Sequence, residues 1–363
     1  EIAQCLVGSE MCIRDRVLPA DAAIRGFRKG TDMKLFVYSL REFDEKRFFK
    51  KWSREMQVEY ASVGDKPTPE NARLAEGYDA VSIITTPVDE EILTIWKECG
   101  VKCVSTRTVG FDHVDRRAAG KLGITVCNAT YPPNGVANYT IMLMLMCCRK
   151  MKPIMMRADV QDYTLPGKIG VEISNSTVGV IGTGKIGRTV LEHLKGFGCR
   201  LLAFDLYPSK EVAEYAEYVD LDTLYKESDI ISLHMPSTAE NFHMINTDTI
   251  AKMKDGVIII NTARGNLIDS EALIKGLESE KIGAAGLDVI ENESNLYYYD
   301  LVGKPMHNEE LAVLRSFPNV IVTPHTAFYT EEAIDYMVKN SILGCRYALE
   351  GKENPFDVSD AAF

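Results

Sequence analysis

Short apolar runs alternate with amphipathic stretches along this chain, and the alternation begins abruptly at Met33. Runs of β-branched and aliphatic residues predict strands, and stretches with apolar residues at every third or fourth position predict helices. The predicted strands cover 34–40, 80–86, 101–108, 124–128, 177–181, 199–204, 230–235, 257–263, 284–289 and 320–323. The predicted helices cover 43–56, 89–99, 116–122, 136–150, 188–194, 247–254, 270–279 and 330–349. This order of strands and helices predicts an α/β protein with mostly parallel, open sheets.

The rhythm is interrupted once, at Tyr131-Pro132-Pro133-Asn134-Gly135, which predicts a hinge between two domains. A length of 363 residues also favours two domains over one. The long last helix would return to the first domain if the chain crosses between the domains twice. We therefore expect one domain from residues 33–131 and 329–355, and another from residues 132–328.

Residues 1–32 lack the alternation of the rest of the chain. The segment from Cys5 to Arg16 resembles a translated sequencing adapter, so we expect these 32 residues to be a non-native or disordered extension. A transit peptide is an alternative, although the serine- and arginine-rich amphipathic pattern of such peptides is weak here.

The run Thr177–Ile181 leads directly into Gly182-Thr183-Gly184-Lys185-Ile186-Gly187, and a helical pattern follows. This order is typical of a dinucleotide site, in which three glycines allow a tight turn, a close approach to the pyrophosphate and helix–strand packing. The pyrophosphate then binds at the helix N-terminus. A second predicted strand ends at Asp205, 18 residues after Gly187, where a carboxylate can bind the ribose hydroxyls. Together these features make an ordinary turn the less favoured interpretation.

Composition excludes several classes of partner. A net charge of −11, with no long stripe of Lys and Arg, argues against nucleic acid. The longest apolar stretch, 139–148, is too short to span a membrane. The nine cysteines have no C-x-x-C spacing, so we expect reduced thiols, a cytoplasmic protein and no metal site.

Three further stretches, each after a predicted strand, carry candidate chemistry. Asn261-Thr262-Ala263-Arg264-Gly265 presents an arginine, whose planar fork suits a carboxylate. The stretch from Asp288 to Glu293 presents three acids. Thr323-Pro324-His325 presents a histidine at a proline turn. Taken singly, a surface ion pair and a solvated acidic loop are equally good interpretations of the first two stretches. A lone histidine is more often structural than catalytic.

The other five histidines provide a reference for His325. His113, His193, His243 and His307 have no comparable setting, and His234 has a partial one. Hydride transfer to a 2-keto acid needs a cation that binds the carboxylate and an acid that protonates the alkoxide. A histidine beside a carboxylate provides such an acid. The three stretches together therefore favour this chemistry.

At these residues the chain resembles the D-2-hydroxyacid dehydrogenases from Met33 to about Pro355, most closely the D-lactate branch that includes the enzymes of vancomycin-resistance clusters. The matching motifs are Ser105 to Gly110, the glycine turn, Leu233 to Pro236, Asn261 to Gly265, Asp288 to Glu293, and Thr323 to Thr330. The resemblance implies a Rossmann-type NAD-binding domain inserted into a flavodoxin-like substrate domain. It also implies a homodimer built on the helix after Tyr131.

The resemblance assigns roles to residues of this chain. Arg264 would bind the substrate carboxylate and carbonyl, His325 would be the proton donor, and Glu293 would be its partner. Val109 and Gly110 would bind the carboxylate through backbone N–H groups, and Tyr131 and Phe328 would line the pocket. The residues expected around NAD are Gly182, Gly184, Lys185, Ile186, Gly187, Asp205, Met235, Pro236, Asn241, Thr262, Ala263, Arg264 and Asp288.

Two departures from the family concern the hinge and the pocket. Pro132-Pro133-Asn134 stands where relatives usually have Ser-Pro-Asn, and no aromatic residue lies between Ser82 and Pro87. We expect NADH-dependent reduction of pyruvate to D-lactate. Two alternatives remain: a reductase for bulkier 2-keto acids such as 2-ketoisocaproate or phenylpyruvate, and an NAD(H)-sensing regulator on the same fold.

Overall fold

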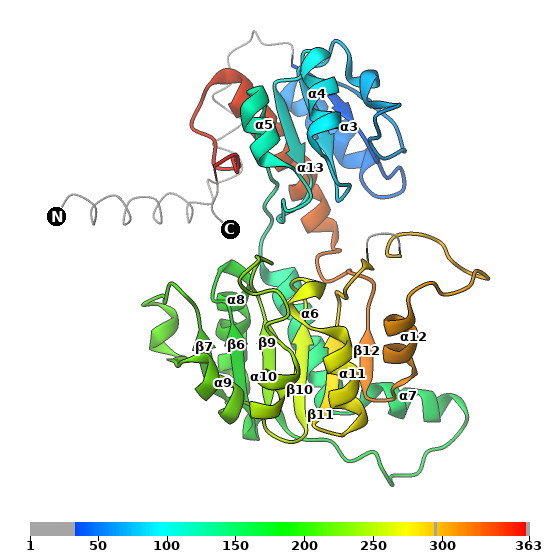
Figure 1. Cartoon of the computed structure of the whole chain (residues 1–363), viewed down its shortest axis with the longest axis vertical. Helices are drawn as coiled ribbons and strands as arrows, with labels where there is room; N and C mark the ends of the chain where they lie inside the picture. The colour runs from blue at the N-terminus through cyan, green and yellow to red at the C-terminus, as the bar shows by residue number, and fades with distance from the viewer. Residues whose placement is uncertain (1–32, 294–295, 361–363) are drawn as a thin grey trace, which may run out of the picture. The chain divides into compact units, whose positions relative to one another are not determined.

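A computed structural model of the chain describes residues 33–293 and 296–360. Among these residues, 33–131 and 330–360 form one compact unit, and 132–329 form a second (Figure 1). The expectation that residues 1–32 lie outside the fold falls outside the described residues.

The first unit is built on a five-stranded parallel sheet in the order β2-β1-β3-β4-β5. Its strands are β1 (Lys34–Val37), β2 (Glu59–Ser62), β3 (Ala80–Ile83), β4 (Cys103–Thr106) and β5 (Thr125–Cys127). Its helices are α3 (Lys46–Met56), α4 (Glu90–Glu98), α5 (Arg116–Leu122) and α13 (Glu331–Glu350).

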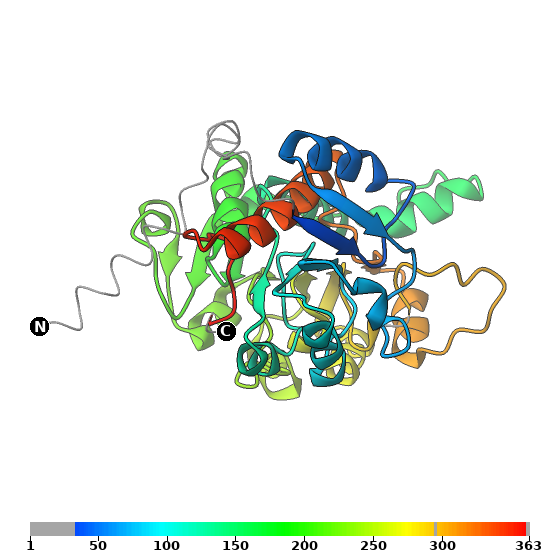
Figure 2. The ribbon, with the colours of Figure 1, turned by 90° about the horizontal axis from the view of Figure 1, so that it is seen from above.

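Helices cover both faces of this sheet. On α3, Phe49, Trp52 and Met56 recur at helical spacing and pack with residues of α13 against one face. Figure 2 shows α13, in orange to red, beside α3 of the same unit. On the other face, Leu93 and Trp96 of α4 lie in a second core with α5. The last helix of the chain thus belongs to the fold of the first unit.

The second unit is built on a seven-stranded parallel sheet in the order β12-β11-β10-β9-β6-β7-β8. Its strands are β6 (Thr177–Ile181), β7 (Arg200–Phe204), β8 (Glu217–Tyr218), β9 (Ile230–Leu233), β10 (Val257–Asn261), β11 (Ile282–Leu287) and β12 (Val320–Val322). Its helices are α6 (Asn134–Cys148), α7 (Met151–Asp159), α8 (Lys185–Leu194), α9 (Leu221–Glu227), α10 (Thr247–Lys252), α11 (Ser270–Glu278) and α12 (Glu309–Ser316).

The helices of this unit also form two layers. Helices α9 to α12 pack on one face through a core that includes Ile250 and Leu273, and α6 and α8 pack on the other through Leu143 and Val190 (Figure 1). The strand order reverses at β6, which lies between β7 and β9. Ligands of such sheets bind beyond the carboxyl ends of the strands at this reversal. The expected doubly wound parallel architecture is confirmed in both units.

The structure corrects the sequence analysis in detail. Most strands are shorter than predicted, and β2, β8, α7, α9 and α12 were not predicted. The predicted hinge overlaps a helix, because Asn134 and Gly135 already form the first turn of α6.

Candidate active site

The glycine turn between β6 and α8 has the geometry that its sequence predicts. Gly182 has a φ of +91°, and a Cβ there would lie 2.6 Å from the carbonyl oxygen of His234. A Cβ on Gly187 would lie 1.9 Å from the carbonyl oxygen of Gly182. A Cβ on Gly184, by contrast, would have no atom within 4 Å. Two glycines therefore let the turn close, and the third leaves open space beside the N-terminus of α8, where a pyrophosphate fits.

Asp205, directly after β7, is fixed beside this turn. Its Oδ2 accepts hydrogen bonds from the backbone N–H of Thr183 at 2.5 Å and from the Thr183 hydroxyl at 3.0 Å. Its Oδ1 accepts a hydrogen bond from the N–H of Tyr207 at 2.9 Å. Because a carboxylate has about four lone-pair positions and three are used, acceptor capacity remains for one ribose hydroxyl. The hydroxyl of Tyr218, 2.7 Å from that of Thr183, extends this network and was not anticipated from the sequence.

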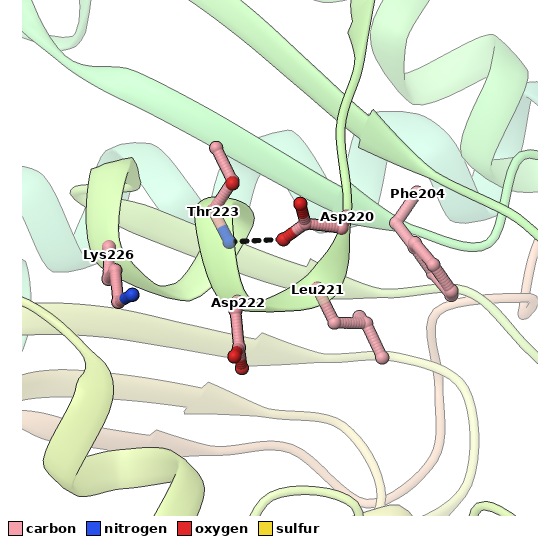
Figure 3. Close-up of a pocket in the computed structure, with 6 residues that line it drawn as sticks. All are labelled: Phe204, Asp220, Leu221, Asp222, Thr223 and Lys226. Carbon is pink, nitrogen blue, oxygen red and sulfur yellow. Dashed lines mark hydrogen bonds between the residues drawn. The ribbon is translucent and has the colours of Figure 1, made fainter.

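An open hollow of about 490 Å³ lies next to the end of β7 (Figure 3). Phe204 and Leu221 supply its apolar wall, and Asp220, Asp222, Thr223 and Lys226 supply its polar wall. Asp220 accepts a hydrogen bond from the N–H of Thr223 at 2.7 Å and so caps α9. Asp222 pairs with Lys252 at 2.7 Å. Since both acids serve the packing of helices, this hollow adds no group to the chemistry.

The loops after β9 and β10 carry other residues expected around the cofactor. Asn241 closes its own loop, because its Oδ1 accepts from the N–H of Thr238 and its Nδ2 donates to the carbonyl of Pro236, both at 2.8 Å. The Thr262 hydroxyl lies 2.8 Å from that of Thr140 on α6. These side chains therefore fix the shape of the loops, while Met235 and Ala263 are half-buried beside the same strand ends.

Arg264 lies three residues after β10, in a loop that is held from both sides. The Asn261 side chain donates to the carbonyl of Arg264 at 2.8 Å and accepts from the N–H of Ala263 at 3.0 Å. A Cβ on Gly265 would lie 2.0 Å from the carbonyl oxygen of Ile290. Only glycine lets this loop pass so close to the loop after β11, and the close passage fixes where Arg264 leaves the sheet.

One buried carboxylate, that of Asp288, organises the turn that carries His325. Its Oδ1 accepts from the Thr323 hydroxyl at 2.7 Å and the N–H of Thr326 at 2.9 Å, and its Oδ2 accepts from the N–H of Ala327 at 2.9 Å. Asp288 is fully buried. Its bonds make it the support of the His325 turn, and its place near the cofactor stays a prediction.

His325 and Glu293 are brought together at the end of this turn. Nδ1 of His325 lies 2.6 Å from Oε1 of Glu293, and each side chain is 25% exposed. Oε2 of Glu293 accepts a hydrogen bond from the N–H of Ile290 at 3.1 Å, which fixes the carboxylate. Among the described residues, none contacts Nε2 of His325 within hydrogen-bond distance. The ring is therefore held at one nitrogen and can exchange a proton at the other.

Phe328 lies close to the histidine, with ring centroids 6.3 Å apart in an edge-to-face arrangement. This geometry is favourable for aromatic rings and limits rotation of the imidazole. The second unit thus holds Arg264, Glu293, His325 and Phe328 on loops after parallel strands.

In the first unit, Val109 and Gly110 form a turn after β4. The carbonyl of Val109 accepts from the Asn128 side chain at 2.8 Å, and that of Gly110 accepts from the Thr108 hydroxyl at 2.5 Å. In the part of the chain that the structure describes, no acceptor lies within hydrogen-bond distance of the two N–H groups. Adjacent backbone N–H donors of this kind are the groups with which a nest binds an anion. Tyr131, half-buried, ends the first segment of this unit.

The sequence analysis missed a second histidine–carboxylate pair. Nε2 of His243 lies 2.6 Å from Oε1 of Glu291, although we had found no such setting for His243. The other oxygen of Glu291 accepts from the N–H of Ser270 at the start of α11, at 2.9 Å. The signal was present as an acid two positions before Glu293, but the pairing joins residues 48 positions apart.

His234 has a third environment. Its Nε2 lies 2.8 Å from the Ser232 hydroxyl, and burial lowers the pKa of His234 to about 3. This histidine is neutral at physiological pH and cannot serve as the acid of a reduction.

Comparisons with known proteins agree with this geometry. Residues 141–327 match the family described as "D-isomer specific 2-hydroxyacid dehydrogenase, NAD binding domain". The chain is 44% identical over 323 residues to an aromatic 2-oxoacid reductase of Clostridium sporogenes, covering 88% of this chain and 97% of that protein. It belongs to the D-isomer specific 2-hydroxyacid dehydrogenase family.

Other relatives extend the similarity. A D-lactate dehydrogenase of Lactobacillus delbrueckii subsp. bulgaricus is 40% identical over 328 residues, covering 88% of this chain and 97% of that protein. The solved structure of D-2-hydroxyisocaproate dehydrogenase has a TM-score of 0.82 and 33% identity, covering 90% of this chain and 100% of that chain. This D-2-hydroxyacid dehydrogenase is thus an NAD-dependent oxidoreductase of 2-keto and 2-hydroxy acids.

Two further findings concern the described part of this dehydrogenase only. None of its helices combines the length and apolar character needed to cross a membrane. Over the same residues, no three His, Cys, Asp or Glu side chains are grouped to hold a metal ion.

Proposed function

We propose that this enzyme reduces the 2-keto group of a small acid with NADH, and that Arg264, Glu293 and His325 carry the reaction. The single observation that supports this most is the state of the imidazole, which is held at Nδ1 by Glu293 at 2.6 Å. When NADH is bound, it supplies the hydride.

Each of the three residues has a distinct task in this proposal. Negative charge develops on the carbonyl oxygen during reduction, and His325 donates a proton to it from Nε2. Glu293 fixes the ring orientation and stabilises the cationic imidazolium before that transfer. The guanidinium of Arg264 binds the substrate carboxylate with its planar fork and polarises the carbonyl.

We further propose that residues 132–329 are the cofactor domain and that the first unit is the substrate domain. Gly182 to Gly187 and Asp205 would hold NAD. In the first unit, the N–H groups of Val109 and Gly110 would be donors to a carboxylate, and Tyr131 would contact the substrate. In the second unit, Phe328 would contact the substrate.

On the substrate, we propose pyruvate, whose product is D-lactate, in line with the D-lactate dehydrogenase relative at 40% identity. A bulkier 2-keto acid is the second candidate, because the stretch between Ser82 and Pro87 contains no aromatic residue. The relative at 44% identity, an aromatic 2-oxoacid reductase, also favours it.

We also propose a homodimer in the cytoplasm. An apolar hollow between α6 and α8 of the second unit is lined by residues such as Met142, Leu145 and Phe197, of which Met142 and Phe197 are exposed. A second copy would cover this surface. Seven described cysteines are free thiols, as expected in a reducing compartment.

One experiment tests both the reaction and the substrate. NADH oxidation is followed with pyruvate, 2-ketoisocaproate and phenylpyruvate, using the unmodified enzyme and Arg264→Lys. We expect turnover in the unmodified enzyme, and a loss in kcat/KM of roughly 10- to 100-fold in the variant with NADH affinity retained, because lysine keeps the charge but loses the fork. No turnover with any 2-keto acid, or an unaffected variant, would contradict the proposal.

A further inference from the structure

Tyr298 contacts the backbone of His325. Its hydroxyl donates a hydrogen bond to the carbonyl oxygen of His325 at 2.9 Å. The two rings lie with centroids 6.2 Å apart. Tyr298 is only five positions after Glu293 in the chain. One short stretch of sequence therefore binds His325 at two points, the ring through Glu293 and the backbone through Tyr298.

The backbone of His325 needs such support. Its φ is +53°, in the left-handed region, which costs a non-glycine residue about 1–2 kcal/mol. On the other side of the same residue, the N–H of His325 donates to the carbonyl of Asp288 at 2.8 Å. The Tyr298 hydroxyl is the donor for the carbonyl. Both polar groups of His325 are thus held while the ring faces Glu293.

Tyr298 itself is positioned from the core. Its neighbour Tyr297 is buried in the hydrophobic core of the second unit. The N–H groups of Leu296 and Tyr297 donate to the carbonyl of Glu293 at 3.0 and 3.2 Å. The residue that bonds the histidine ring and the residue that bonds its backbone are therefore tied to each other as well as to His325.

We propose that Tyr298 is a positioning residue for the reduction: its hydroxyl holds the His325 peptide so that the imidazole keeps its short contact with Glu293. This inference rests on the proposed role of His325 as proton donor. Loss of the hydroxyl lets the strained backbone relax, and the imidazolium then loses part of the stabilisation that the carboxylate gives it.

The test compares Tyr298→Phe with Tyr299→Phe. The two tyrosines are adjacent and 53% and 54% exposed, so the second is a matched control. We measure kcat, both KM values and the pH dependence of 2-keto acid reduction, alone and combined with Glu293→Gln. Because one hydrogen bond contributes about 0.5–1.5 kcal/mol, Y298F should lower kcat about two- to tenfold, with KM for NADH unchanged. Its reduction profile should also move to lower pH, and Y299F should match the unmodified enzyme.

The combined variant shows whether Tyr298 acts through Glu293. In the E293Q background, Y298F should lower kcat less than twofold and leave the pH profile in place. The inference is overturned if Y298F matches Y299F, or if it lowers only thermal stability without moving the pH profile. If E293Q alone leaves the profile in place, the proposed Glu293–His325 pair itself is wrong. If E293Q moves the profile and Y298F does not, only the role of Tyr298 is wrong.

Discussion

Two histidine–carboxylate pairs occupy neighbouring loops of the second unit, and their contacts have the same length. His325 and Glu293 lie 2.6 Å apart, as do His243 and Glu291. The pairs differ in what surrounds the second nitrogen. Nδ1 of His243 faces Asp269 at 3.9 Å, and the ring of Phe242 stacks on the imidazole at 3.8 Å. No described residue lies within hydrogen-bond distance of Nε2 of His325.

The surroundings of the two acids differ as well. Glu291 also accepts a hydrogen bond from Ser270 at the start of α11, so it links His243 to a helix. Glu293 accepts its other bond from Ile290, within its own loop. A short contact alone therefore does not identify a proton donor. An imidazole with a carboxylate beside each nitrogen supports structure, and one with an open nitrogen can carry chemistry.

The largest expected effect separates the two histidines directly. His325→Gln should lower kcat for 2-keto acid reduction about 10²- to 10⁴-fold, because a general acid is lost. His243→Gln should change kcat by no more than about threefold. Steady-state rates of the two variants are compared after their thermal stability and NADH affinity have been shown to match those of the unmodified enzyme. Equal losses in the two variants would mean that the open nitrogen does not distinguish the pairs.

Only part of the site could be predicted from the sequence. Gly182, Arg264 and His325 could be predicted because each lies within three residues of a strand end, and a strand end fixes the place of the next residues. The His243–Glu291 pair could not, because it depends on how two loops 48 positions apart meet.

The missed elements have a similar physical reason. β8 has two residues, and β2, at the sheet edge, has exposed ends and two half-buried residues between them, so neither forms an apolar run. Helix α9 has only seven residues, and its N-cap is Asp220, which the sequence presents as one more acid in a loop. Short elements gain their stability from packing that the sequence does not display.

A third histidine, His234, differs from both pairs because it makes the stability of the protein depend on pH. The pKa of His234 is lowered from 6.5 to about 3 by burial, so the folded protein resists a proton that the unfolded chain accepts. The contribution of His234 to the free energy of unfolding is fully present above about pH 6.5 and is lost as the pH falls toward 3. About 2 kcal/mol of it is lost at pH 5. Thermal unfolding at about pH 6.5 and pH 5 should show a smaller acid-induced loss of stability in His234→Gln than in the unmodified enzyme. An unchanged loss would contradict a neutral His234.

The smallest effect concerns the stability contributed by the His243–Glu291 pair. Glu291→Gln removes the charged acceptor shared by His243 and Ser270, and should lower the free energy of unfolding by about 1–2 kcal/mol. Glu293→Gln should lower it by less, since its other bond is local. Urea unfolding of both variants measures this difference, and the reverse order would show that Glu293 is the structural acid.

The central claim is that Glu293 controls the proton on His325, and paired pH profiles of kcat test it most directly. 2-Keto acid reduction needs the cationic imidazolium, so its rate should fall as the pH rises. Glu293→Gln removes the charge that favours the cation, and the profile should move to lower pH. Glu291→Gln should leave the profile where it is. A profile that stays in place for Glu293→Gln, or moves equally in both variants, would contradict the account.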